Sequence, residues 1–179
     1  MTNSNTLLVL ENPYDPNTMK ALHYMEFHQC TNLESVTLMP NIKKIGGRVF
    51  AGCISLKRMT IPSSIETIES GVFDGCTSLL TVDIPSTYIP AVFPDSMFKG
   101  CSSLTSLIEI PDTVITIGQT TFMGCCSLEG VKMKGTTPPT LGYGVFNDTT
   151  FPIYVPQEAV NTYKSASGWT SVSSRIVGY

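Results

Sequence analysis

Residues 56–76 read LKRMTIPSSIETIESGVFDGC, and closely similar strings precede and follow them. Each string contains a phenylalanine, and successive phenylalanines lie 23 to 25 residues apart, at Phe27, Phe50, Phe73, Phe98, Phe122 and Phe146. A fixed period of this length indicates a repeat protein, in which neighbouring units bury each other's apolar side. The chain is therefore predicted to be a solenoid of stacked coils.

Cysteine and leucine keep the same register as phenylalanine. A cysteine lies three positions after each of the first five phenylalanines, and a leucine lies six positions after it. These residues are Cys30, Cys53, Cys76, Cys101 and Cys125, and Leu33, Leu56, Leu79, Leu104 and Leu128. Stacked strands place equivalent residues about 4.8 Å apart, so we expect internal columns of phenylalanine, leucine and cysteine.

A short strand is predicted after each leucine. In residues 58–61 polar and apolar residues alternate up to Pro62, which indicates a strand with one buried face. Proline cannot donate to a ladder and so ends the strand. The inward residues are expected to be Val36, Met59, Val82, Leu107 and Val131. A second apolar pair forms the opposite wall, as Ile42/Ile45, Ile65/Ile68, Ile89/Val92 and Val114/Ile117.

Three units depart from the repeat. The unit between Ile84 and Phe98 carries two extra residues, and the strand in residues 104–110 carries one, which predicts a bulge. The unit that starts at Phe146 has aspartate and threonine in place of the glycine and cysteine, which is typical of a closing coil.

The open ends of a solenoid need covering. Residues 1–26 do not match the repeat and are predicted to form an N-terminal cap, with a short helix over residues 18–25. Residues 27–156 are predicted to form the solenoid, with five full coils and the closing coil. Residues 157–179 form a helical C-terminal cap: Pro156 is suited to open a helix that reaches Ser165, and Trp169 is expected to plug the last coil.

The sequence offers no catalytic, cofactor or metal site. The five repeated cysteines are expected to form a reduced, buried column, because they lack the paired spacing of a zinc site. The sixth, Cys126, falls outside that column. The two histidines, His23 and His28, lack the spacing of a metal pair, and Cys30 near His28 is expected to point inward. We therefore expect a protein that is not an enzyme.

The repeat strings resemble the BspA-type leucine-rich repeats of bacterial surface proteins, over roughly residues 27–156. The resemblance rests on the recurring pattern L-x-x-I-x-I-P-x-x-[IV]-x-x-I-x-x-x-[AV]-F-x-G-C. It implies a leucine-rich-repeat solenoid, a right-handed β/α-type superhelix of mainly short parallel strands, turns and short helical segments. It also implies an extracellular or cell-surface location, although no signal peptide is visible in this chain.

Binding is expected on the outward, concave face of the strands. Its residues flank the inward positions and are Ser35, Thr37, Arg58, Thr60, Thr81, Asp83, Ser106, Glu109, Gly130 and Lys132. A polar stripe of this kind is equally consistent with a solvated sheet face.

Two functions remain open from the sequence. The family resemblance implies a protein-binding or adhesion module, whose partner could be a host or extracellular matrix protein. The alternative is a carbohydrate-binding module, with residues 88–93 or Tyr143 as a stacking platform. The formal net charge of −3 gives no basic surface for nucleic acid, and no apolar run is long enough to span a membrane.

Overall fold

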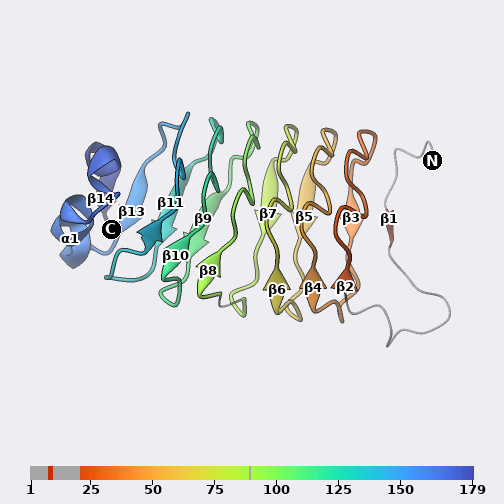
Figure 1. The fold of residues 1–179 in the computed structure, drawn as a ribbon, viewed down its shortest axis with the longest axis horizontal. Coiled ribbons are helices and arrows are strands. Elements are labelled where there is room, and N and C mark those ends of the chain that lie inside the picture. Colours follow the sequence, from red (N-terminus) through yellow and green to blue (C-terminus); the bar gives the residue numbers. More distant parts are fainter. Residues whose placement is uncertain (1–7, 10–20, 89) are drawn as a thin grey trace.

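The computed structural model describes residues 8–9, 21–88 and 90–179 of the chain. These residues wind into a row of stacked coils, with the C-terminal helices at one end (Figure 1). Every pair of neighbouring strands in the described part runs parallel. The predicted solenoid is therefore confirmed.

The first wall of the solenoid is a strand ladder made of three sheets. The N-terminal part contains β1 (Leu8–Val9), β3 (Val36–Thr37), β5 (Arg58–Thr60) and β7 (Thr81–Asp83), with an isolated bridge from Ser35 to Arg58 joining β3 to β5. The C-terminal part contains β9 (Leu107–Ile110), β11 (Gly130–Met133), β13 (Ile153–Val155) and β14 (Ile176–Gly178). Strands β7 and β9 belong to neighbouring coils but lie in different sheets.

The second wall is interrupted at the same place. One sheet joins β2 (Ala21–Leu22), β4 (Lys44–Ile45) and β6 (Thr67–Ile68). The other joins β8 (Val92–Phe93), β10 (Thr116–Ile117) and β12 (Thr140–Leu141). The first wall thus breaks between β7 and β9 and the second between β6 and β8, next to the two adjacent coils that carry the extra residues.

The phenylalanine turns form a third edge, and this edge runs through the break. The N–H of Phe73 donates to the carbonyl of Met97 at 3.0 Å, and the N–H of Phe98 donates to that of Thr121 at 3.0 Å. The rings of Phe73 and Phe98 stack with their centroids 5.8 Å apart, as do those of Phe50 and Phe73 at 6.0 Å. The predicted phenylalanine column is therefore present.

The second wall corrects one predicted pair. Ile89/Val92 was expected to face inward, but Val92 is 50% exposed and Ile89 lies outside the described residues. The buried pair is Tyr88 and Phe93. The N–H of Tyr88 donates to the carbonyl of Pro85, as that of Ile65 does to Pro62, so the extra residues lie between Tyr88 and Phe93.

The register of β9 also differs from the prediction. Val131 pairs with Ile108 rather than with Leu107. Ile108 is buried, whereas Leu107, expected to point inward, is 37% exposed. The predicted bulge is absent, because β9 and β11 pair residue by residue over four positions. The extra residue is taken up before the strand, in the bend at Ser106.

Near the N-terminus, the predicted helix over residues 18–25 is wrong where the structure describes it. Ala21 and Leu22 form β2, which pairs with β4, and residues 23–25 run into a turn. Residues 18–20 lie outside the described part. Strand β1 pairs with β3, so residues 1–26 contribute strands to both walls. Their role as a cap stays a prediction.

The C-terminal segment closes the last coil. Gln157–Ala159 form a 3₁₀ turn (η1), Val160–Ser165 form α1, and Thr170–Arg175 form a second 3₁₀ turn (η2). Trp169 is fully buried, its Nε1 donates to the carbonyl of Pro139 at 2.8 Å, and its ring lies 5.9 Å from that of Phe146. Trp169 occupies the end of the phenylalanine column, as predicted.

The glycine two residues after each phenylalanine is required by the backbone. Gly75 has a φ of +73°, in the left-handed region that a side chain disfavours. We expect Gly75→Ala to lower the free energy of unfolding by about 1–2 kcal/mol, measured by urea denaturation. Gly75→Asn is the matched control and should lose less, because asparagine tolerates this conformation. Equal losses for both variants would contradict the explanation.

Candidate functional site

The outward residues of the first wall define what we call the ladder face. Arg58 pairs with Thr81, and Thr60 pairs with Asp83. Across the break, Leu107 pairs with Gly130, and Glu109 with Lys132. Ser35 and Thr37 continue the face toward the N-terminus.

Two of the residues expected on this face lie elsewhere or contribute nothing to it. Ser106 is wrongly placed in the prediction, because it occupies the bend before β9 and Leu107 takes its outward position. Gly130 is buried, and the ring of Tyr154 leaves no room for a side chain at this position. The remaining predicted residues stand on or beside the strands, but their role in binding stays a prediction.

Most charges near the face are paired between neighbouring coils. Lys57 Nζ lies 2.9 Å from Glu34, and Lys134 Nζ lies 2.6 Å from Glu109. The hydrogen bond to Glu109 raises the pKa of Lys134. Lys132 Nζ lies 3.9 Å from the centre of the Tyr179 ring. Within the described part of the chain, Arg58 takes part in no ion pair, so its charge is available to a partner.

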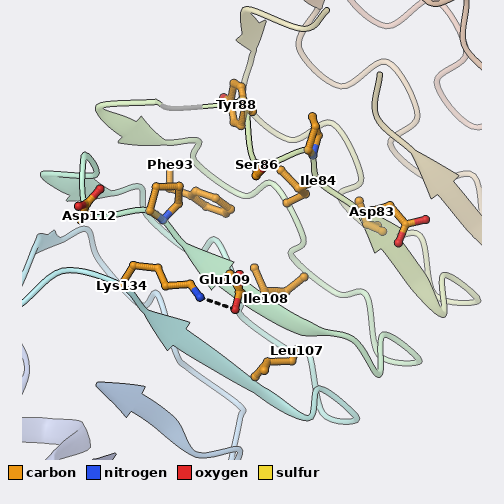
Figure 2. A pocket seen from close by; sticks show the side chains of 13 residues that line it. Asp83, Ile84, Ser86, Tyr88, Phe93, Leu107, Ile108, Glu109, Asp112 and Lys134 are labelled. Carbon is orange, nitrogen blue, oxygen red and sulfur yellow. Dashed lines mark ion pairs between the residues drawn. The ribbon is translucent and has the colours of Figure 1, made fainter. Parts of the chain in front are cut away.

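A groove of about 560 Å³ opens between β7 and β9. Its volume lies within the range of roughly 300–1,000 Å³ that is usual for ligand clefts. Buried Val82, Phe93 and Ile108 contribute apolar surface to it. Figure 2 shows the Glu109–Lys134 pair on the β9 side and Asp83 on the β7 side.

The sequence analysis missed this groove, although the signal was present. Extra residues occur at Ser106 and between Tyr88 and Phe93, in adjacent coils. The extra residue at Ser106 moves β9 one position later in its repeat unit, and the extra residues between Tyr88 and Phe93 move β8 two positions later. Irregularities in adjacent repeats fall side by side in a solenoid, so together they could have predicted an opening.

The aromatic platform expected in residues 88–93 is wrong. Tyr88 and Phe93 are only 5% and 1% exposed, so neither ring can offer its face to a sugar. Burial also raises the pKa of Tyr88. Tyr143, the other residue expected in that role, is 81% exposed.

The cysteine column is a structural element that holds neighbouring coils together. The thiols of Cys53, Cys76, Cys101 and Cys125 are buried, and each donates to the main-chain carbonyl of the repeated phenylalanine in the preceding coil, at 3.0 to 3.2 Å. Burial raises the pKa of Cys53 and Cys125 to about 12 and holds that of Cys76 and Cys101 well above the ordinary range. Protonated thiols of this kind are poor nucleophiles.

Cys30 corrects the predicted column at its N-terminal end. It was expected to point inward with the other four, but it is exposed, as is Cys126. His28 is half-buried, and His23 Nδ1 lies 3.8 Å from Glu26. No group of three or more potential metal ligands occurs in residues 8–9, 21–88 and 90–179. None of the helices in those residues is long and apolar enough to span a bilayer.

Comparison with known families agrees with the coil geometry. Residues 7–106 and 91–167 match the BspA type leucine-rich repeat region, in six copies. The chain belongs to this family. A search of curated proteins found no match.

Solved structures of bacterial leucine-rich repeat proteins show the same fold. A leucine-rich repeat protein of T. pallidum, TpLRR, is 25% identical with a TM-score of 0.68, and the match covers 79% of this chain and 75% of that one. A leucine-rich cell surface protein of Faecalibacterium prausnitzii is 26% identical with a TM-score of 0.51, covering 67% and 38%. A leucine-rich repeat protein of Bacteroides ovatus, 21% identical with a TM-score of 0.62, covers 76% and 37%. The chain thus spans under two-fifths of the latter two proteins.

The buried column predicts two classes of thiol. With a colorimetric disulfide reagent at pH 8, we expect Cys30 and Cys126 to react at once and the other four only after denaturant is added. Cys126→Ser is the control and should remove one fast equivalent. Fast reaction of all six thiols would contradict the burial.

The same thiols should make stability depend on alkaline pH. Folding raises the pKa of Cys53 from its ordinary value of 9.0 to about 12, because the thiol becomes buried. Above pH 9 the unfolded chain therefore loses a thiol proton that the folded chain keeps. The unfolding free energy should therefore fall between pH 9 and 12. Cys53→Ala, measured against the parent protein, should show a shallower fall.

Proposed function

We propose that this BspA-type repeat chain is a non-catalytic protein-binding or adhesion module of a bacterial surface or secreted protein. The observation that carries the proposal is how the repeat uses its side chains. The repeated leucines and the repeated phenylalanines from Phe50 onward are buried, as are four of the five repeated cysteines, and Phe27 is half-buried. Outward positions on the ladder face are free to vary, and repeat proteins bind along such extended surfaces.

The surface location is part of the proposal. It is supported by the family to which the chain belongs and by the similarity to a leucine-rich cell surface protein of Faecalibacterium prausnitzii. The partner class is a protein exposed outside the cell, such as a host or extracellular matrix protein.

A binding assay on immobilised collagen, fibronectin and laminin tests the ladder face. We expect Arg58→Glu to weaken retention on the bound matrix protein about tenfold, because a central arginine is a common source of binding energy. Lys164→Glu, on α1, makes the same change of charge away from the face and should bind as the parent does. Loss of binding in both variants, or in neither, would count against the ladder face.

A carbohydrate-binding function keeps one observation in its favour. Tyr143 is 81% exposed, and an exposed tyrosine ring can stack on a sugar. If this function holds, a glycan array should retain the parent protein and release Tyr143→Ala. An array with no retained glycan would remove the alternative, whereas retention that survives Tyr143→Ala would reassign the sugar to another surface.

A further inference from the structure

We propose that the groove between β7 and β9 binds an extended peptide segment of the partner protein, which pairs with the main chain of both strands. This inference rests on the proposed protein-binding function and assigns it a site and a class of ligand. It starts from the direction of the main-chain groups in the two strands beside the break.

On the β7 side, one main-chain unit faces the groove. The N–H of Ile61 donates to the carbonyl of Asp83 at 3.0 Å, so the main chain of Asp83 points toward β5. Successive residues of a strand direct their N–H and C=O groups to opposite edges. Val82 therefore directs its N–H and C=O toward β9.

On the β9 side, the same reasoning selects Glu109. The N–H of Lys134 donates to the carbonyl of Ile110 at 2.9 Å, so the main chain of Ile110 points toward β11. Glu109 lies one residue earlier and directs its N–H and C=O toward β7. Since β7 and β9 lie in separate sheets, two strand edges face each other across the groove without bonding to each other.

The surrounding structure holds this gap open. The N–H of Thr105 donates to the carbonyl of Leu80 at 3.0 Å, so the two coils are in register up to that point. Ser106 then adds one residue and takes β9 out of step. The stacked rings of Phe73 and Phe98 keep the coils joined on the other side. A free strand edge in a preformed groove is the arrangement that captures an extended peptide by strand addition.

The lining defines the chemistry of the peptide. Side chains of an extended peptide alternate between two faces, so one set would meet the apolar surface of Val82, Phe93 and Ile108. The other set would meet a rim with the carboxylates of Glu109, which pairs with the single ammonium of Lys134, and of Asp112, and with that of Asp83, which also accepts a hydrogen bond from Thr60 on the β5 side. The rim therefore favours lysine or arginine next to an apolar residue, as in an extended apolar–basic segment.

A matched pair of variants separates the main chain of Glu109 from its side chain. Glu109→Ala and Glu109→Pro both remove the carboxylate, but only proline also removes the N–H that faces the groove. The N–H of Glu109 makes no bond to β11 in the pairing described above, so the sheet from β9 to β14 should keep its strands. Thermal melting and circular dichroism of both variants check that they do.

The probe is a phage library of random linear peptides, from which binders of the parent protein are selected and synthesised. We expect the selected peptides to carry an apolar residue beside lysine or arginine. They should bind Glu109→Pro roughly three- to tenfold more weakly than Glu109→Ala, the effect of one lost hydrogen bond. Equal binding by the two variants would overturn the proposal.

Hydrogen exchange gives a second measurement, independent of any substitution. In the free protein the amides of Val82 and Glu109 should exchange much faster than that of Ile110, and a bound peptide should slow both. Deleting Ser106 should bring β9 into step with β7, protect both amides without peptide and abolish peptide binding. Peptides that leave the two amides unprotected would overturn the proposal.

Two further outcomes separate the inference from the function on which it rests. Matrix binding that depends on Arg58 but is the same in Glu109→Pro and Glu109→Ala would keep the proposed function and overturn the groove as its site. Protection of the Val82 and Glu109 amides that rises with protein concentration, without peptide, would assign the groove to a second copy of the chain and also overturn it.

Discussion

Contact between equivalent residues of neighbouring coils is the constraint on which this structure depends. No coil of about two dozen residues could bury its own apolar side. The phenylalanine rings stack at about 6 Å from coil to coil. The thiol of each buried cysteine donates a hydrogen bond to the main-chain carbonyl of the phenylalanine in the preceding coil. Identity at a repeat position is therefore a requirement of packing.

The sequence predicted most of the fold because most of it is periodic. The columns, the parallel strands, the helical C-terminal segment and the burial of Trp169 all follow from spacing and alternation. The prediction failed in the units with extra residues, where the spacing from one repeated residue points to a different inward residue than the spacing from another. Leu107 was placed inward by its distance from Leu104, whereas the register with β11 puts Ile108 there. Val92 was misplaced for the same reason, since Pro85 fixes Tyr88 and leaves the extra residues after it.

The candidate site was harder to predict, because it arises from a misfit between coils. The sequence shows that a repeat unit has an extra residue, but it does not show in which part of the coil that residue is accommodated. Ser106 is absorbed in a bend, so β9 stays regular and the disturbance passes to its pairing with β7. The N-terminal segment failed differently: residues 21–22 form a strand because β4 offers an edge to pair with, and that long-range contact outweighs local helical preference.

The interrupted walls also bear on how the molecule resists mechanical load. Along most of the solenoid, three edges hold each coil to the next, but β6 is not paired with β8 and β7 is not paired with β9, so across these two steps the phenylalanine edge and the hydrogen bond from Thr105 to Leu80 provide the continuous main-chain contact. In a linear array of repeats, the stability is approximately a sum of repeat stabilities and of interface energies between neighbouring repeats. The interface at this break has fewer strand pairs than the other interfaces, so we expect its energy to be smaller. A chain under tension would be expected to separate first at that seam, between β7 and β8, leaving two folded halves joined by the connecting segment.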